Sequence, residues 1–298
     1  MESIPKKVLI VGLGRIGQFW KSLVEEVPAA LNLIGTVDPF NEEATYKTFD
    51  EELLELCDGI LVCSPTATHA EFVVSALRKN KFVLCEKPLC SEDEEIKRCF
   101  SEVKVDHQLL VGLNRRWDER IFNLRNSNPS TVSIDCRDFP EPPDSFLKHS
   151  GGVYVDCLIH EFDILQFALG FDGSDTKITL VDQHTQDNET KSEESRVEFI
   201  KSATVVLGNP SGNVACVRFC RRFADRYVHT ITLDNGKKLD PGLQPGASFI
   251  DRFKPAFQSL LATFIRIMNG EANGHDIARI PTVDHCLNLN RLCSECVK

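Results

Sequence analysis

The stretch KVLIVGLGRIG, residues 7–17, decides the fold of the first part of this chain. Its first five residues form a short apolar run, which predicts a buried β-strand. Three glycines follow at once, at positions 12, 14 and 17, and a helical run then continues to about Val27. A strand, a glycine-rich turn and a helix in this order are typical of a site that holds the pyrophosphate of a dinucleotide at the helix N-terminus.

Each glycine of this turn has its own predicted role. Gly12 permits the tight turn, Gly14 lets the backbone approach a pyrophosphate, and Gly17 allows the helix to pack closely on the strand. Glycines in this spacing also occur in ordinary parallel sheets that bind no nucleotide. The turn alone therefore does not distinguish a dinucleotide-binding site from an ordinary parallel sheet. The residue that ends the next strand can distinguish them.

The next apolar strand, Leu33 to Val37, ends in Asp38, about 20 residues after the last glycine of the turn. A carboxylate at this position accepts hydrogen bonds from the ribose hydroxyls of adenosine and would repel a 2′-phosphate. The three residues that follow, Pro-Phe-Asn, include no arginine that could bind such a phosphate. The sequence therefore favours NAD over NADP as the cofactor.

The alternation of strands and helices continues to about residue 117. Further apolar strands are predicted at 59–63, 82–85 and 108–113, with helical segments between them. This pattern predicts a doubly wound parallel sheet, a Rossmann fold of the α/β class, as an NAD-binding domain over residues 1–117. Ligands bind at the carboxyl ends of parallel strands, so we expect the cofactor to contact the residues there and on the helix after the third strand. These residues are Gly12, Gly14, Arg15, Ile16, Gly17, Asp38, Ser64, Pro65, Thr66, His69, Glu86, Lys87 and Arg116.

The sequence Glu86-Lys87-Pro88 directly follows the buried strand 82–85. Pro88 restricts Lys87 to an extended backbone conformation, so the direction of the lysine side chain is constrained. Next to a nicotinamide cation the ammonium charge would be partly destabilised, which suits a group that relays protons. The alternative is that Glu86 and Lys87 form an exposed charged turn.

A second candidate site lies in SGGVYVDCLIHEFD, residues 150–163, which predicts a mostly buried helix continuing to Leu169. At about 100° per residue, Asp156, His160 and Asp163 fall within a stripe about 60° wide. A carboxylate one turn before an imidazole is the pair that makes an oriented general base. The two glycines at the start would let another backbone or a ligand come close. The alternative is that the stripe simply faces water.

The pattern changes after Trp117. Strand-like runs are predicted at 130–138, 177–181, 202–207, 214–220 and 227–233, and helices at 249–269 and 283–296. They predict a substrate and oligomerisation domain of the α+β class over residues 118–298, built on a large, mostly antiparallel open sheet. The polar stretch 182–195 is predicted to be a surface loop or a mobile segment. The open face of such a sheet needs a cover, which another subunit could supply.

Composition excludes several classes of partner. The 298 residues carry a net charge of -10, which argues against nucleic acid and against an anionic membrane surface. No apolar run approaches the roughly 20 residues that span a bilayer. The N-terminus leads straight into a strand without the pattern of a signal peptide, so we expect a cytoplasmic protein.

The twelve cysteines are scattered along the sequence, which predicts reduced thiols rather than disulfides. The pair Cys293-x-x-Cys296 lacks a second pair, so no metal site is predicted.

Five separated segments resemble, in sequence and in order, the glucose-fructose oxidoreductase / inositol dehydrogenase / MocA family, and within it the myo-inositol 2-dehydrogenase branch. The resemblance implies an NAD-dependent oxidoreductase that acts on a secondary hydroxyl of a cyclic polyol or sugar. It also implies a Lys-Pro bond that is often cis, and a homodimer or homotetramer formed through the C-terminal sheet. The segments are GLGRIG (12–17), CSPTATHAEFVVSAL (63–77), FVLCEKPL (82–89), GLNRRWD (112–118) and SGGVYVDCLIHEFD (150–163).

The resemblance implies three catalytic residues. His160 would take the hydroxyl proton, Asp156 would orient and stabilise the imidazole, and Lys87 would polarise the same oxygen. Asn114 and Arg116 are expected to contact the substrate together with these three residues.

The substrate itself stays open. Ala224 stands where the inositol-type enzymes often carry a tyrosine that faces the substrate. The alternatives are a dihydrodiol-type or other carbonyl or diol oxidoreductase of the same family, and a regulator that senses NAD(H) or a sugar without turnover. A regulator would have no need of the lysine, the aspartate and the histidine together.

Overall fold

The computed structural model describes residues 4–125, 127–137, 152–171, 173–186, 199–220, 228–239 and 249–297. The chain divides into two units. The first consists of residues 1–114 and 257–287, and the second of residues 115–256 and 288–298. The sequence pattern predicted one boundary, after residue 117. Helical periodicity shows which face of a helix is buried but not which unit it packs against. The sequence pattern therefore could not show that residues 257–287 belong to the first unit.

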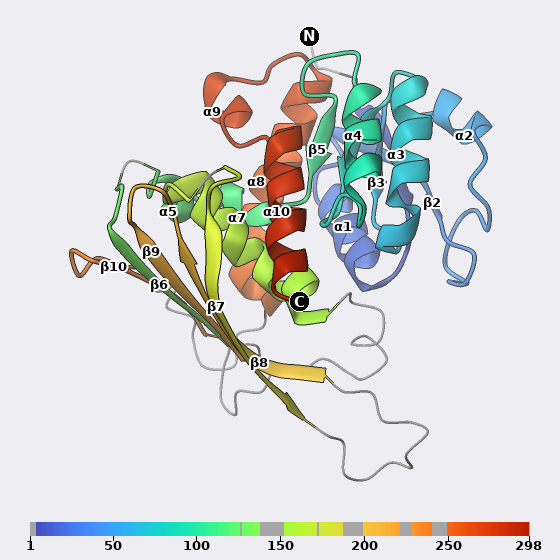
Figure 1. Cartoon of the computed structure of the whole chain (residues 1–298). Helices are drawn as coiled ribbons and strands as arrows, with labels where there is room; N and C mark the ends of the chain where they lie inside the picture. The colour runs from blue at the N-terminus through green and yellow to red at the C-terminus, as the bar shows by residue number, and fades with distance from the viewer. Residues whose placement is uncertain are drawn as a thin grey trace, which may run out of the picture. The chain divides into compact units, whose positions relative to one another are not determined.

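The first unit is built on a five-stranded parallel sheet with the strand order β2-β1-β3-β4-β5 (Figure 1). All four residues of β3 and the last four of β1 are buried, which explains why these strands appear in the sequence as continuous apolar runs. The order confirms the doubly wound fold. The strands are β1 (Lys6–Val11), β2 (Leu31–Val37), β3 (Gly59–Val62), β4 (Phe82–Cys85) and β5 (Leu109–Val111).

Helices connect these strands and cover the sheet of the first unit. Helix α1 buries Trp20, Leu23 and Val24, which lie three and four residues apart and so share one face. The connecting helices are α1 (Arg15–Glu25), α2 (Glu52–Glu55), η1 (Thr66–Thr68), α3 (His69–Arg78) and α4 (Asp93–Ser101). Later in the chain come α8 (Phe249–Met268), α9 (Gly274–Ile277) and α10 (Val283–Glu295).

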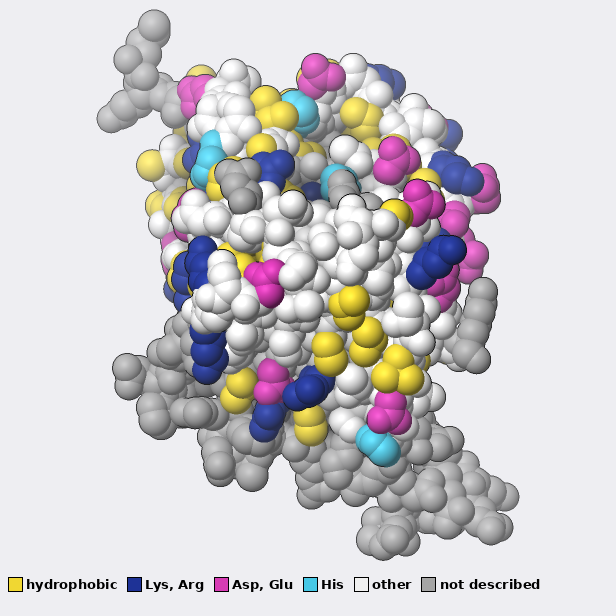
Figure 2. Space-filling view, turned by 60° about the vertical axis from the view of Figure 1, so that its left-hand side comes forward, with side chains coloured by type: hydrophobic (Ala, Val, Ile, Leu, Met, Phe, Trp, Pro, Cys, Tyr) yellow, Lys and Arg dark blue, Asp and Glu magenta, His cyan; other side chains and the backbone are white. Residues whose placement is uncertain are grey.

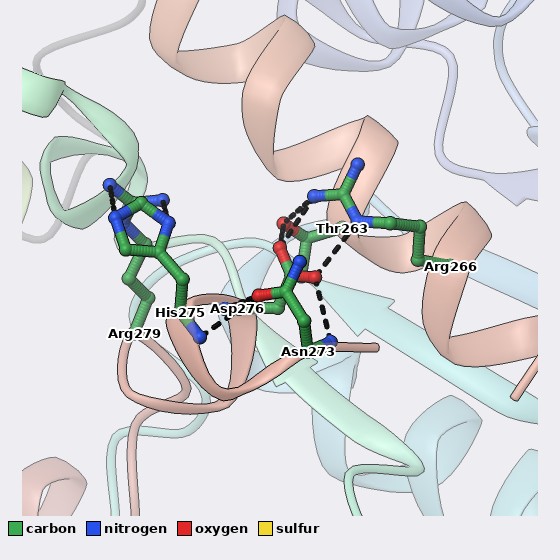
Figure 3. A network of polar contacts seen from close by, with 6 residues as sticks. All are labelled: Thr263, Arg266, Asn273, His275, Asp276 and Arg279. Atoms are coloured by element: carbon green, nitrogen blue, oxygen red, sulfur yellow. Dashed lines mark hydrogen bonds and ion pairs between the residues drawn. The ribbon is translucent and has the colours of Figure 1, made fainter. Parts of the chain in front are cut away.

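A buried carboxylate fastens α9 to the end of α8 (Figure 3). Asp276 accepts hydrogen bonds from the Thr263 hydroxyl at 2.9 Å, from Arg266 Nε at 2.8 Å and from the backbone N–H of Asn273 at 3.1 Å. The Asn273 side chain in turn accepts from the backbone of α9, which completes a capping box. The bond from Arg266, followed by those from Asn273 and Thr263, outweighs burial and lowers the pKa of Asp276 to about 2. The carboxylate is therefore charged at neutral pH and holds the two helices together.

The second unit is built on a six-stranded sheet with the order β11-β10-β6-β9-β8-β7. Every neighbouring pair is antiparallel except β6 and β9, which run parallel at the centre of the sheet. The mostly antiparallel sheet predicted from the sequence is confirmed. The strands are β6 (Thr131–Arg137), β7 (Lys177–Gln186), β8 (Phe199–Gly208), β9 (Val214–Cys220), β10 (Val228–Leu233) and β11 (Lys238–Leu239).

The prediction of a surface loop beginning at residue 182 is wrong for its first five residues. Strand β7 continues to Gln186, and Asp182, Gln183 and His184 pair with β8 although their side chains are exposed. An edge strand that is polar on both faces lacks the alternation that marks a half-buried strand, so its sequence looks like a loop. Residues 187–198 lie outside the described residues.

Helical segments line one face of this sheet, as Figure 1 shows for α5 and α7. All ten residues of α7 are buried. None of the helices in the described ranges combines the length and apolar character that a membrane crossing needs. On the face shown in Figure 2, acidic and basic side chains are interspersed. The helices are η2 (Asn114–Trp117), α5 (Glu119–Phe122), η3 (Tyr154–Leu158) and α7 (Ile159–Ala168).

Candidate active site

The glycine-rich turn after β1 has the geometry that the sequence predicts. Gly12 has φ of +94°, and a Cβ atom there would lie 2.4 Å from the backbone nitrogen of Ser64. A Cβ atom on Gly17 would lie 2.0 Å from the carbonyl oxygen of Gly12. The tight turn and the close packing of helix on strand are confirmed. Gly14 is exposed at the N-cap of α1, and a Cβ atom there would meet nothing within 4 Å, so a ligand could approach the backbone at the start of this helix.

Asp38 lies at the carboxyl end of β2, and backbone N–H groups hold its carboxylate. Oδ2 accepts a hydrogen bond from Leu13 at 2.8 Å, and Oδ1 accepts bonds from Phe40 at 2.8 Å and Asn41 at 2.9 Å. Partial burial opposes the charge, but the three backbone bonds outweigh it, so the pKa of Asp38 lies below its ordinary value. A charged acceptor is therefore fixed beside the glycine-rich turn.

Phe40 and Asn41, which follow Asp38 closely in the sequence, also lie beside the glycine-rich turn or the end of β2. Asn41 Nδ2 donates to the carbonyl oxygen of Leu13 at 2.7 Å and ties the end of β2 to the turn after β1. The Phe40 side chain is 90% exposed. The sequence pattern identified Phe40 only as a residue that is not arginine. An aromatic residue two positions after the carboxylate predicted to bind the ribose is the signal that could have identified Phe40.

The buried side chain of His69 links the loop after β3 to the loop after β4. Its Nε2 lies 2.8 Å from the carbonyl oxygen of Ser64, and its Nδ1 lies 2.9 Å from that of Pro88. Burial lowers the pKa of His69, while the hydrogen bonds to backbone carbonyls raise it and leave a net decrease. The cofactor contact predicted for His69 stays a prediction; its observed partners are backbone carbonyls of the two loops.

Glu86 is buried, so the alternative of an exposed charged turn is wrong for this residue. Its Oε1 accepts a hydrogen bond from the indole N–H of Trp20 at 2.7 Å, and its Oε2 accepts from the backbone N–H of Lys87 at 3.2 Å. Lys87 is half-buried, and the Lys87–Pro88 bond is cis, as the resemblance implied. No local pattern indicates the Trp20 contact, because Trp20 belongs to the apolar face of α1.

In the second unit, Asp156 and His160 lie in consecutive helical segments of different geometry. Asp156 is half-buried in the π-helical turn η3, and His160 is buried in the α-helix α7. The expected uniform α-helix is therefore wrong over residues 154–158, so the 100° spacing does not relate Asp156 to His160. Gly152 has φ of +82°, which favours glycine, whereas Ser150 and Gly151 lie outside the described residues.

Asp163, the third member of the predicted stripe, is fully buried and bound to Arg116. Arg116 Nε donates to both carboxylate oxygens of Asp163, at 2.9 and 3.0 Å, and Nη2 adds a bond of 2.5 Å. The Arg116 guanidinium also lies 4.8 Å from the centre of the Phe167 ring. Asp163 therefore does not face water. The cofactor and substrate contacts predicted for Arg116 stay predictions.

A second buried polar contact fixes α7 to the sheet. Glu161 Oε2 lies 2.8 Å from His229 Nε2 on β10, and both side chains are buried. Burial opposes the charge of Glu161, but His229, Arg115 and Arg252 outweigh it and lower its pKa. The residue after His160 is thus bonded across to the sheet, a role that the sequence pattern did not reveal because a glutamate in a helix is usually exposed.

Asn114 and Ala224 are the remaining residues for which the sequence analysis made a prediction about the substrate. Asn114, in the first unit, is buried, and its side-chain oxygen has no hydrogen-bond partner among the residues that the structure describes. A buried acceptor without a partner is costly unless a ligand satisfies it. Arg222 to Arg226 lie outside the described residues, so the prediction about Ala224 stays a prediction.

Comparison with known proteins identifies relatives for both units. Residues 6–113 match the model of an oxidoreductase family with an NAD-binding Rossmann fold. The chain is 28% identical to myo-inositol 2-dehydrogenase of Thermotoga maritima, over 89% of each protein. It is also 28% identical to inositol 2-dehydrogenase of Rhizobium meliloti, over 76% of this chain and 72% of that enzyme.

Solved structures share the fold over nearly the whole length. The scyllo-inositol dehydrogenase of Lactobacillus casei, crystallised with NAD(H) and scyllo-inositol, is one of them. It covers 98% of this chain and 97% of its own, with a TM-score of 0.78 at 18% identity. At this level of identity the likeness concerns the fold alone.

Proposed function

Because the chain belongs to the glucose-fructose oxidoreductase / inositol dehydrogenase / MocA family of NAD-binding oxidoreductases, we propose that it transfers a hydride between nicotinamide and a secondary hydroxyl of an inositol-like polyol or a sugar. The observation that carries this proposal is the Asp38 carboxylate, fixed by three backbone N–H groups beside a glycine-rich turn. The test is a panel of cyclitols, sugars and diols, assayed by the absorbance of NADH. Turnover of no member of the panel would favour the regulator that senses NAD(H) or a sugar.

The residues of the first unit fit the cofactor. The open N-terminus of α1 after Gly14 would hold the pyrophosphate, and Asp38 would accept the ribose hydroxyls. The exposed ring of Phe40 would cover the adenine, which is attached to that same ribose. Bound NAD would supply the hydride acceptor.

We propose that three side chains do the chemistry on the substrate. His160 takes the proton from the hydroxyl, and Asp156 orients the imidazole and stabilises its charge. Lys87 polarises the same oxygen, and the buried oxygen of Asn114 accepts a hydrogen bond from the ligand. The contribution of the protein is orientation and electrostatics, because the cofactor carries the hydride.

Replacing Asp38 by alanine should shift cofactor preference toward NADP. A hydrogen bond to a charged group is worth about 1.5–3 kcal/mol, so kcat/KM for NAD should fall about tenfold or more. NADP should lose less, because its 2′-phosphate no longer meets a carboxylate, and adding Pro39→Arg should widen the effect. Steady-state kinetics with both cofactors measure the ratio, with Asp106→Ala, an exposed carboxylate of the same unit, as control. A wild-type protein that already prefers NADP would contradict the role of Asp38.

We further propose that the protein is a cytoplasmic homo-oligomer that associates through the six-stranded sheet. Buried and partly exposed side chains alternate along β8 and β9. Val205 and Val217 are buried on one face of the sheet, whereas Val206 and Cys216, which pair with each other, are partly exposed on the other face. Val214 nearby is 42% exposed. A broad antiparallel sheet with one face partly apolar and uncovered favours pairing with a second copy.

Light scattering at micromolar concentration should therefore give a mass of at least twice 33.5 kDa. A charge placed on the open face, Val206→Glu, should reduce that mass toward the monomer because two like charges would meet in a symmetric interface. The matched control Leu56→Glu introduces the same charge at an exposed position on the first unit. A clean monomer for the wild type would mean that the open face does not associate.

A further inference from the structure

The contact between Trp20 and Glu86 joins the nucleotide-binding helix to the loop that carries Lys87. Trp20 lies on α1, the helix that starts directly after the glycine-rich turn, and it is fully buried. Its indole N–H donates to Glu86 Oε1 at 2.7 Å. Glu86 stands between β4 and Lys87, and its other oxygen accepts from the backbone N–H of Lys87. One carboxylate therefore bonds both to α1 and to the lysine loop.

The space around this carboxylate is closed. A Cβ atom at Gly112, just after β5, would lie 3.2 Å from the Cα, Cδ and Oε2 atoms of Glu86. The Phe257 ring packs against the Trp20 indole edge to face, with centroids 5.2 Å apart. Gly112 thus lies against the carboxylate and Phe257 against the indole, and the two hydrogen bonds that the carboxylate accepts set its orientation.

The charge of Glu86 depends on the same two bonds. Burial raises the pKa of Glu86 above its ordinary value, and the hydrogen bond from Trp20 and the ammonium and N–H of Lys87 oppose this rise without cancelling it. The other titratable groups beside it are the thiols of Cys63 on the β3 side and Cys85 on β4, and burial raises the pKa of both. These thiols are neutral at physiological pH, so Trp20 and Lys87 are the groups that favour a charged Glu86.

We propose that Trp20 is a positioning residue for the hydride-transfer reaction: its indole N–H keeps the Glu86 carboxylate oriented and charged, and this carboxylate fixes Lys87. The inference rests on the proposed function, in which Lys87 polarises the substrate oxygen. It adds a residue on the nucleotide-binding helix that acts on the lysine through Glu86 without touching the substrate.

Trp20→Phe keeps a buried ring but removes the N–H, which leaves Glu86 Oε1 buried without that donor. The neutral form of Glu86 is then favoured, so protonation begins at a higher pH than in the wild type. We expect kcat to fall about tenfold or more at pH 6 and less than about threefold at pH 9, because the protonated fraction of Glu86 decreases as the pH rises. KM for NAD should change less than about twofold, because the phosphate-binding turn is intact.

Two further variants separate this role from general packing. Glu86→Gln cannot ionise, so its loss of kcat should be the same factor at pH 6 and at pH 9. Phe257→Leu loosens the packing on the Trp20 ring without touching the carboxylate, and its kcat should stay within about twofold of wild type at both pH values. A Trp20→Phe protein that loses nothing, or that loses the same factor at every pH, would overturn the proposal.

Tryptophan fluorescence tests the contact without any substrate. The difference in emission between the wild type and Trp20→Phe reports on the Trp20 indole, and it should change as the pH falls and Glu86 gains a proton. The titration should vanish when the same difference is measured in a Glu86→Gln background. A flat difference signal would overturn the role of Glu86, whereas a clear titration in a protein that oxidises no polyol would overturn the proposed function alone.

Discussion

Replacing His160 by alanine should lower turnover by about 10²- to 10⁴-fold, because loss of a general base removes the acceptor for the hydroxyl proton. The dissociation constant for NAD should stay within about twofold of wild type, since the glycine-rich turn and Asp38, which we propose to bind the dinucleotide, lie in the other unit. A large loss of rate with unchanged cofactor affinity is the pattern of a group that acts on the reacting hydroxyl.

The measurement is single-turnover hydride transfer with enzyme in excess, using a substrate found active in the panel. The matched control is His184→Ala, a histidine of β7 whose side chain is 74% exposed, and it should leave the rate unchanged. A His160→Ala rate within threefold of wild type would remove His160 from the mechanism. Asp156 would then lose its proposed role as well, because it acts through the imidazole.

Replacing Asp163 by alanine should destabilise the second unit by about 3–5 kcal/mol. The variant leaves the Arg116 guanidinium, which is 1% exposed, without the carboxylate that accepts three of its hydrogen bonds. A buried charge without its partner is far more costly than the net gain from the original pair, so the effect should exceed that of any exposed ion pair in the chain.

Urea unfolding followed by circular dichroism measures this loss. Glu94→Ala is the control: its ion pair with Lys97 is 2.6 Å long, but both side chains are largely exposed, so its loss should change the stability little. Replacing the pair together, Arg116→Met with Asp163→Leu, should recover most of the stability because no charge is left buried. An Asp163→Ala protein as stable as Glu94→Ala would show that water or another acceptor replaces the carboxylate.

The sheet of the first unit could be predicted from sequence because most residues of its central strands are buried. The last four residues of β1 and all residues of β3 and β4 form apolar runs, and the glycines at 12 and 17 stand where any side chain would meet backbone within 2.4 Å. Such constraints act over a few residues and leave a local signature. Asp38 could be identified for the same reason, since it directly ends a buried strand.

The features that escaped prediction depend on partners distant in sequence. Nothing local shows that Glu86 bonds Trp20, that Asp163 bonds Arg116, or that Glu161 bonds His229 across 68 positions. A charged residue in a helix looks the same whether it faces water or a buried partner. The π-helical turn at Tyr154–Leu158 also escaped, because one extra residue per turn changes the hydrogen-bond pattern without changing composition.

The parallel pair at the centre of the second sheet restricts how the chain can fold during synthesis. Strand β6 pairs with β9 and β10, and its first residue, Thr131, meets Val214 far along the chain. Both edges of β6 therefore stay unsatisfied while the intervening chain is made, and contacts so distant in sequence form slowly. The first unit also includes residues 257–287, which are made near the end of synthesis. Neither unit can finish folding on the ribosome until most of the polypeptide has emerged, so the nascent chain exposes unpaired strand edges that chaperones would have to shield.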